Sequence, residues 1–303
     1  MKSKQEALTK QRILAGIFLM VLSSASFSAM QLMIRYSNVD GTFPLMEQVF
    51  FRNLGSFIGA WIVLRKKGEF PLGSRKVQPY LMGRSVAGVL GIITFFYATN
   101  HARIADANIL NKLSPFVVTV LSAVFLGEKV RKVQYTALLI SFAGAWIVCG
   151  PTLDSAPLPV LAALGSAVFS GIAYTFVAAL KDKADPLVVV MHFSTLSVVC
   201  AALCMMPDFV VPTASQLLCL LLISVFGSLG QVALTYAYRF APASEVSIYN
   251  YSGIIWSALL GWIFLGERVS AATVLGGTMV AGSSLLAFIC GKRRRQRELQ
   301  SGD

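Results

Sequence analysis

The sequence predicts an all-α membrane protein with ten transmembrane helices, arranged as two inverted five-helix repeats. The 303-residue chain is 56% hydrophobic and only 13% charged, whereas soluble domains are nearer a quarter charged. Apolar runs of about 18–23 residues, long enough to cross a bilayer, recur along its whole length. Residues 91–130 also align without a gap on residues 230–269, so one segment occurs twice. These observations leave no stretch for a soluble domain.

The expected spans are separated by residues that end helices, such as Asp40-Gly41, Gly150-Pro151 and Asp185-Pro186. The ten spans are 12–34, 44–64, 77–99, 104–126, 133–150, 157–180, 186–206, 215–239, 243–265 and 271–290. The first repeat is expected to cover residues 12–150 and the second repeat residues 157–290. A basic cytoplasmic tail follows over residues 291–303.

The two copies of the repeat share charged as well as apolar positions. The turn after the fourth span reads Phe125-Leu-Gly-Glu-Lys-Val130, and its counterpart reads Phe264-Leu-Gly-Glu-Arg-Val269. In the spans before this segment, Pro44 corresponds to Pro186. Because each half holds an odd number of spans, the second half must enter the membrane from the opposite side, which gives an inverted repeat.

Most of the 26 lysines and arginines fall in segments that are expected on one side of the membrane. By the positive-inside rule this side is the cytoplasm, so both termini are expected there. The segments are the N-terminus, residues 65–76, 129–132 and 181–183, Arg268 and the C-terminal tail. We therefore expect a multi-pass protein of the cytoplasmic (inner or plasma) membrane, with the lipid bilayer as a partner. Topology also explains the net charge of +12 without nucleic acid.

Ten spans in two repeats, each with Phe-Leu-Gly-Glu-(Lys/Arg)-Val after its fourth span, resemble the drug/metabolite transporter superfamily, and its EamA family in particular. The resemblance covers nearly the whole chain, and it is more specific for fold than for substrate. It implies a central cavity lined mainly by spans 1, 3, 4, 6, 8 and 9. Many relatives have a small or apolar residue where this chain has Lys112, and this departure favours a polar or anionic substrate.

Lys112 is the first candidate substrate ligand, because it interrupts the fourth span at mid-membrane depth. A lysine there costs about 2.5–3.5 kcal/mol on insertion scales, so it normally faces protein or a watery cavity. Helical spacing puts Asn108 on the same face, and the repeat equivalent of Lys112 is Tyr251. Pro115 removes a backbone hydrogen bond, so we expect a kink in the helix beside Lys112. The alternatives are a lysine that snorkels outward and a structural ion pair with an acid at a helix end, namely Glu47, Asp106 or Glu245.

Arg84 in the third span is the second candidate ligand, and Gly88 follows on its face. The alternative is a buried pairing partner, and Arg52 in the second span is interpreted mainly as a structural tether. Serines on the first and sixth spans form polar stripes that favour a cavity lining. The remaining candidate substrate ligands are polar and aromatic residues expected to face the cavity: Asn111, Tyr97, Phe95, Tyr174, Gln231, Tyr236, Asn250, Tyr251 and Trp256.

Four acids in matched positions of the two repeats receive separate interpretations. Asp106 and Glu245, interpreted as opening spans 4 and 9 at the outer face, are candidates for proton coupling or gating. The competing interpretation is a carboxylate that stabilises the first turn of its helix through the dipole. Glu128 and Glu267, in the cytoplasmic Gly-Glu turns, are interpreted as starting the next helix.

These observations favour a secondary transporter that moves a small anionic or zwitterionic metabolite by alternating access. A broad-specificity exporter of amphipathic compounds and an intramembrane enzyme are the alternatives. The sequence has no Walker A or HExxH motif, two histidines, and five scattered cysteines without CxxC spacing, so we expect no metal, no cofactor and no catalytic set. A homodimer remains open.

Overall fold

The structure, a computed structural model, describes residues 2–37, 44–70, 72–101, 104–150, 156–266 and 271–301, and every regular element in these ranges is a helix. Eight expected spans correspond to single helices: α1 (Lys2–Ser37), α2 (Leu45–Lys67), α3 (Gln78–His101), α6 (Lys132–Cys149), α7 (Pro157–Ala179), α8 (Pro186–Met205), α9 (Ala214–Phe240) and α12 (Ala271–Ser301). Short 3-10 turns, η1 (Arg75–Val77) and η2 (Met206–Asp208), precede α3 and follow α8.

The fourth and ninth spans are each broken, where the sequence predicted continuous helices, with a kink at Pro115 in the fourth span alone. Span 4 consists of α4 (Ile104–Asn111) and α5 (Ser114–Phe125). Span 9 consists of α10 (Ala243–Val246), the 3-10 helix η3 (Ser247–Tyr251) and α11 (Ser252–Leu265). Proline explains the first break, because Pro115 has no N–H to donate to the preceding turn. Span 9 has no proline at its break, so the sequence carried no comparable signal there.

Within the described residues, six segments are long and apolar enough to cross a membrane: Gln11–Ile34, Pro157–Ala179, Pro186–Asp208, Ala214–Phe240, Ala243–Leu265 and Ala271–Cys290. Ile109–Phe125 and Lys132–Val148 are apolar but shorter. α2 and α3 have 23 and 24 residues, and they carry Glu47, Arg52 and Arg84 within their length. These three ionisable residues therefore lie within long helices of the bundle, and the contacts of the two arginines form part of the candidate site.

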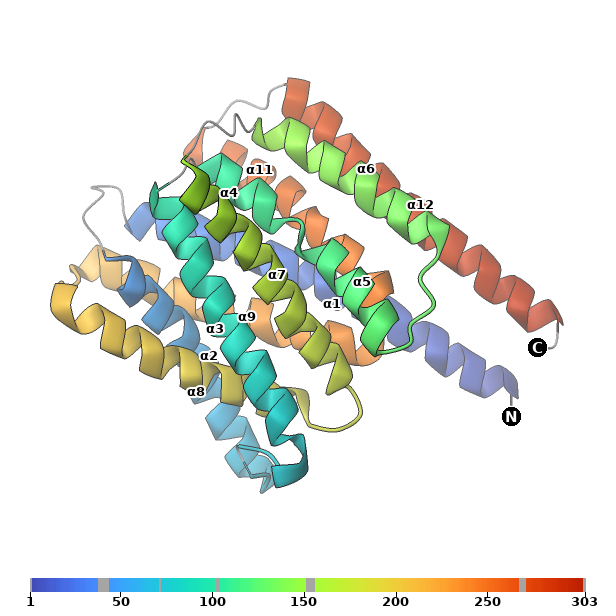
Figure 1. Cartoon of the computed structure of the whole chain (residues 1–303), viewed down its shortest axis with the longest axis horizontal. Helices are drawn as coiled ribbons and strands as arrows, with labels where there is room; N and C mark the ends of the chain where they lie inside the picture. The colour runs from blue at the N-terminus through green and yellow to red at the C-terminus, as the bar shows by residue number, and fades with distance from the viewer. Residues whose placement is uncertain are drawn as a thin grey trace.

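Helices pack in pairs that each join the two halves of the chain: α1 with α9, α3 with α7, α2 with α8, and α6 with α12 (Figure 1). The α6–α12 pair forms one edge of the molecule, and both termini lie at the same end (Figure 1). A Cβ built on Gly144 of α6 would lie 2.6 Å from the Gly276 carbonyl oxygen of α12. The missing side chains therefore let these backbones approach closely.

Hydrogen bonds between helix ends show which turns lie at the same end of the molecule. The Glu128 carboxylate accepts from the backbone N–H groups of Ala243 and Ser244, both at 2.9 Å. Glu128 therefore caps the first turn of span 9. α6 instead begins at Lys132, and its N-cap residue Arg131 donates its backbone N–H to the side-chain oxygen of Gln134 at 2.7 Å. The interpretation that Glu128 starts the next helix is wrong, because the sequence could not show that the start of span 9 lies beside this turn.

Glu245 lies at the same end as Glu128, with its carboxylate 3.7 Å from the Arg131 guanidinium. The expectation that Glu245 faces the outside while Glu128 faces the cytoplasm is therefore wrong. Span 9 ends at the opposite end of the molecule, where the Tyr36 hydroxyl at the end of α1 donates to the Phe264 carbonyl at 2.8 Å. This position conflicts with the assignment of Arg268 to the cytoplasmic segments. Arg268 itself lies outside the described residues.

Candidate substrate-binding site

The breaks of spans 4 and 9 are joined to each other. The Tyr251 hydroxyl donates to the Lys112 carbonyl oxygen at 2.6 Å, and the Lys112 ammonium donates to the Asn250 carbonyl oxygen at 3.4 Å. The Lys112 carbonyl is open to the phenol because the Phe116 N–H donates to the Leu113 carbonyl instead, at 3.0 Å. The carbonyl that the Pro115 kink releases is thus bound by the other half of the chain.

Helix α1 supplies hydroxyl groups to the same region. The Ser24 hydroxyl lies 3.4 Å from both the carbonyl oxygen and the Oδ1 of Asn250, and the Ser28 hydroxyl donates to the Gly253 carbonyl at 2.9 Å. A Cβ on Gly253 would lie 3.7 Å from the Lys112 ammonium. The serine stripe that the sequence predicted on the first span therefore lies against the broken span 9, close to the lysine.

The equivalent stripe on α7 lies against span 4. The Asn111 amide donates to the Ser166 hydroxyl at 2.9 Å. A Cβ on Gly91 of α3 would lie 3.2 Å from the Ser170 hydroxyl. One turn further, the Tyr174 ring stacks on Tyr238 with centroids 5.8 Å apart. The stripe thus leads from the neighbour of Lys112 to an aromatic pair between α7 and α9.

Arg84 is 2% exposed, and its guanidinium lies 4.0 Å from the centre of the Phe193 ring of α8. A Cβ on Gly88 would overlap this guanidinium, so the glycine makes room for it. Arg52 and Tyr174 lie within electrostatic range of Arg84. No carboxylate forms an ion pair with Arg84 among the described residues.

The other candidates are more dispersed. Gln231 is buried and donates to Thr235 at 3.4 Å. Tyr97 is 37% exposed and stacks on His101 at 4.3 Å. Tyr236 packs against Phe240, with ring centroids 5.9 Å apart. Phe95 packs against the main core, and Trp256 is half-buried on α11. No described contact joins Tyr97 or Tyr236 to Lys112.

The side chains of two predicted site residues, Asp106 and Asn108, lie outside the described part of the structure. Tyr251 is fully buried, so in this conformation it offers no exposed atom to a substrate and acts as a support for the span 4 break. Sequence reasoning missed Phe193 as the ring beneath Arg84, because no pattern along the chain indicates that this part of α8 packs on α3.

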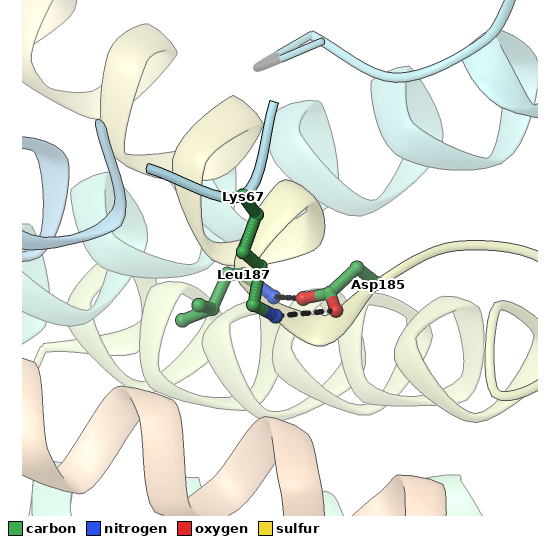
Figure 2. Close-up of polar contacts among 3 residues, drawn as sticks. All are labelled: Lys67, Asp185 and Leu187. Atoms are coloured by element: carbon green, nitrogen blue, oxygen red, sulfur yellow. Dashed lines mark hydrogen bonds and ion pairs between the residues drawn. The ribbon is translucent and has the colours of Figure 1, made fainter. Parts of the chain in front are cut away.

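A cavity of about 350 Å³ lies at one end of the molecule, around the start of α8. Its lining includes Glu69, Lys183 and Asp185. Figure 2 shows the Asp185 carboxylate accepting from both the Lys67 ammonium, at 3.1 Å, and the Leu187 backbone N–H, at 2.8 Å. Hydrogen bonding to Asp185 raises the pKa of Lys67 above its ordinary value of 10.5. This ion pair ties the end of α2 to the start of α8.

Long apolar helices, paired across the two halves of the chain, define a membrane-embedded, multi-pass protein. The chain belongs to the EamA-like transporter family, whose model matches residues 14–150 and 157–289. This match confirms the resemblance to the drug/metabolite transporter superfamily that the repeated motif indicated.

Two relatives and one solved structure illustrate the match. The chain is 35% identical over 268 residues to the "Pseudopaline exporter CntI" of Pseudomonas aeruginosa, covering 88% of this chain and 93% of the relative. It is 26% identical over 296 residues to the riboflavin transporter of Rhizobium johnstonii, covering 96% of each. A solved crystal structure superposes with a TM-score of 0.79 at 18% identity, covering 94% of this chain and 98% of the other. This last likeness concerns the fold alone.

Proposed function

We propose that this protein is a secondary transporter that moves a small anionic or zwitterionic metabolite across the cytoplasmic membrane by alternating access. Its ten spans would form two inverted five-helix repeats, with both termini in the cytoplasm. The relatives named for pseudopaline export and riboflavin transport support a metabolite as the substrate. The buried arginine and the half-buried lysine favour a charged metabolite over a lipophilic compound, because an intramembrane cation is retained where it has a use.

The contacts between helices support the inverted repeat. If spans 1–5 are equivalent to spans 6–10, the α1–α9 pair must have α7–α3 as its counterpart, and α2–α9 must have α8–α3. Both counterparts occur. The α2–α8 and α6–α12 pairs are their own counterparts, as expected for helices that pack across a pseudo-twofold axis.

The observation that carries the proposal is the pair of joined helix breaks at Lys112 and Tyr251. In transporters built from inverted repeats, substrates bind where discontinuous helices meet near the middle of the membrane. We assign the anionic group of the substrate to Lys112 and Arg84. Its polar groups would meet the amides of Asn111 and Asn250, and its apolar part would meet the aromatic side chain of Tyr174.

The coupling assignment follows the corrected positions of the acids. Glu245 lies beside Arg131 at the end that is expected in the cytoplasm, and Asp106 holds the equivalent position at the start of span 4. We propose one acid as a gate or proton-coupling group near each end of the transport path. Substrate transport in proteoliposomes that depends on an imposed pH gradient, and is lost in the Asp106→Asn, Glu245→Gln double variant, would support this assignment.

The experiment for the function itself begins with purified full-length protein in detergent. A thermal-shift screen against a metabolite library identifies compounds that bind, because a ligand that binds the folded state stabilises it by mass action. Hits are then tested for counterflow in proteoliposomes. Uptake that saturates and is accelerated by the same compound on the other side supports a transporter. Binding without flux across the membrane contradicts it.

A further inference from the structure

Arg52 and Arg84 are intramembrane cations without an anionic partner among the described residues. Two ion pairs among the described residues, Lys67 with Asp185 and Arg131 with Glu245, lie at helix ends. The Nε atoms of Arg52 and Arg84 are both buried, and neither has a hydrogen-bond acceptor. Arg52 lies on α2 and Arg84 on α3, and both helices pack against α8, so each cation makes the burial of the other less favourable.

The packing holds both guanidiniums in the same way. Arg84 lies over the Phe193 ring at 4.0 Å and Arg52 over the Phe27 ring at 5.6 Å. Gly88 makes room for the Arg84 guanidinium, and a Cβ on Gly227 would lie 2.9 Å from the Arg52 Cγ. An aromatic face attracts the cation, but it accepts none of the N–H donors that point outward in the guanidinium plane. The packing therefore orients the guanidinium donors of both arginines but gives neither Nε–H a hydrogen-bond acceptor.

We propose that Arg52 and Arg84 together form an oxyanion-binding site, separate from Lys112, for a carboxylate or phosphate group of the transported compound. The inference rests on the proposed transport function and deepens it. Guanidinium groups match carboxylate and phosphate oxygens with parallel hydrogen bonds, and one oxyanion between two guanidiniums would offset their mutual repulsion. Arg52, interpreted from the sequence as a tether, becomes a ligand in this arrangement.

The α7 stripe connects this site to the lysine. Ser166 contacts Asn111, the neighbour of Lys112, and Tyr174 is within electrostatic range of both arginines. Eight residues along a helix span about 12 Å, so one helix face joins the two cationic centres. The substrate class that uses both centres is a metabolite with more than one anionic group.

The test uses purified full-length protein with sodium succinate, sodium phosphate and sodium chloride at equal ionic strength. Succinate and phosphate should raise the melting temperature of the wild type more than chloride does. Part of this rise in melting temperature is a general effect, because salts excluded from the protein surface stabilise the folded state, and every variant shares it. Arg52→Gln and Arg84→Gln should lose the remainder of the rise. Arg65→Gln should keep it, because Arg65 stacks on Trp61 at the exposed end of the same helix as Arg52.

Several outcomes would overturn the site. Equal oxyanion effects in wild type, Arg52→Gln and Arg84→Gln would do so. If Arg84→Gln does not fold, Arg84→Lys and Arg52→Gln carry the comparison, since lysine keeps the charge but not the planar set of donors. An oxyanion effect that depends on both arginines, combined with wild-type transport in the variants, would mean that the site holds an inorganic anion, which also contradicts the proposal.

Transport separates this inference from the function on which it rests. The arginine variants should raise the KM for the substrate about ten- to a hundredfold, the loss expected for one charge-assisted hydrogen bond. Lys112→Met should keep the oxyanion effect on the melting temperature while transport falls. A transport defect in the arginine variants with normal transport in Lys112→Met would leave the arginine site standing and remove Lys112. The opposite pattern would remove the arginine site alone.

Discussion

The Tyr251 hydroxyl donates to the Lys112 carbonyl oxygen at 2.6 Å, and the two residues are 139 positions apart in the chain. The same interval superposes residues 91–130 on residues 230–269. Two equivalent positions of the repeat are therefore in contact where both spans are broken. In the inverted repeat that we propose, equivalent residues would meet at the pseudo-twofold axis, and this contact would mark the region in which the two halves move relative to each other.

Tyr251→Phe tests whether this contact supports the break in span 4. The change leaves the buried Lys112 carbonyl without its phenol donor, which should cost about 1–3 kcal/mol of stability. The measurement is thermal unfolding in detergent. Tyr36→Phe is the matched control, because Tyr36 also donates to a carbonyl but at an exposed position. A loss in Tyr251→Phe no larger than in Tyr36→Phe would argue against a supporting role.

Gly88→Ala tests whether the glycine makes room for Arg84. The added Cβ would overlap the guanidinium and lie 2.8 Å from the Phe193 ring, and such overpacking typically costs about 1–3 kcal/mol. Gly59→Ala is the control, since its Cβ would meet nothing within 4 Å, and it should be neutral or slightly stabilising. Equal melting temperatures for the two variants would show that Arg84 is not confined by Gly88.

Glu128→Gln tests the cap that joins the first repeat to span 9. Glutamine has one acceptor oxygen where the carboxylate uses two, so one of the Ala243 and Ser244 N–H groups loses its partner. The cost should be about 1–2 kcal/mol. Hydrogen–deuterium exchange should increase in the first turns of span 9 and stay unchanged at the start of α6. An increase confined to α6 would restore the original sequence interpretation.

The Lys67–Asp185 pair predicts a dependence on alkaline pH. The pKa of Lys67 is raised above 10.5, so the stabilisation is complete below pH 10.5 and is lost as the pH rises through the higher pKa of the folded protein. The pair is partly exposed, so its contribution should stay below about 1 kcal/mol. The melting-temperature difference between wild type and Lys67→Gln should shrink above this pH, whereas Lys66→Gln should show no such trend.

Asp185 has a second role that the same assay separates. Its carboxylate also caps α8 through the Leu187 N–H. Asp185→Asn keeps a good capping side chain and loses the ion pair, so it should match Lys67→Gln. Asp185→Ala loses both and should cost about 1 kcal/mol more. Equal losses in the asparagine and alanine variants would mean that the cap contributes nothing.

The expected spans follow the observed helices closely, because apolar length and breaker residues are local features of the sequence. The Pro115 kink was local too, and it was found. The 3-10 turn at Ser247–Tyr251 was not, since no residue in it forbids an α-helix. What the sequence could not supply was contact between distant segments. For this reason the cap from Glu128 to Ala243, the Phe193 ring beneath Arg84 and the end of the molecule that holds Glu245 became visible only in the fold.

The candidate site residues fall into two groups, those that the structure brings together at the helix breaks and those that lie elsewhere. Lys112, Asn111 and Asn250 were identified by polarity within apolar spans, and the structure brings them together around the two breaks. Tyr97 and Tyr236 were identified as aromatic residues on spans that were expected to line the cavity. Aromatic side chains pack almost anywhere in such helices, and these two lie against His101 and Phe240.

The central claim is that Lys112 binds the anionic group of the substrate, and Lys112→Met tests it most directly. Methionine keeps much of the side-chain volume and removes the charge, while the backbone carbonyl that Tyr251 binds remains. Transport and thermal stability are measured side by side on wild type and Lys112→Met. We predict that the affinity for the substrate falls about ten- to a hundredfold with little change in melting temperature. Full transport, or a stability loss of about 3–5 kcal/mol as for a broken buried ion pair, would contradict the claim.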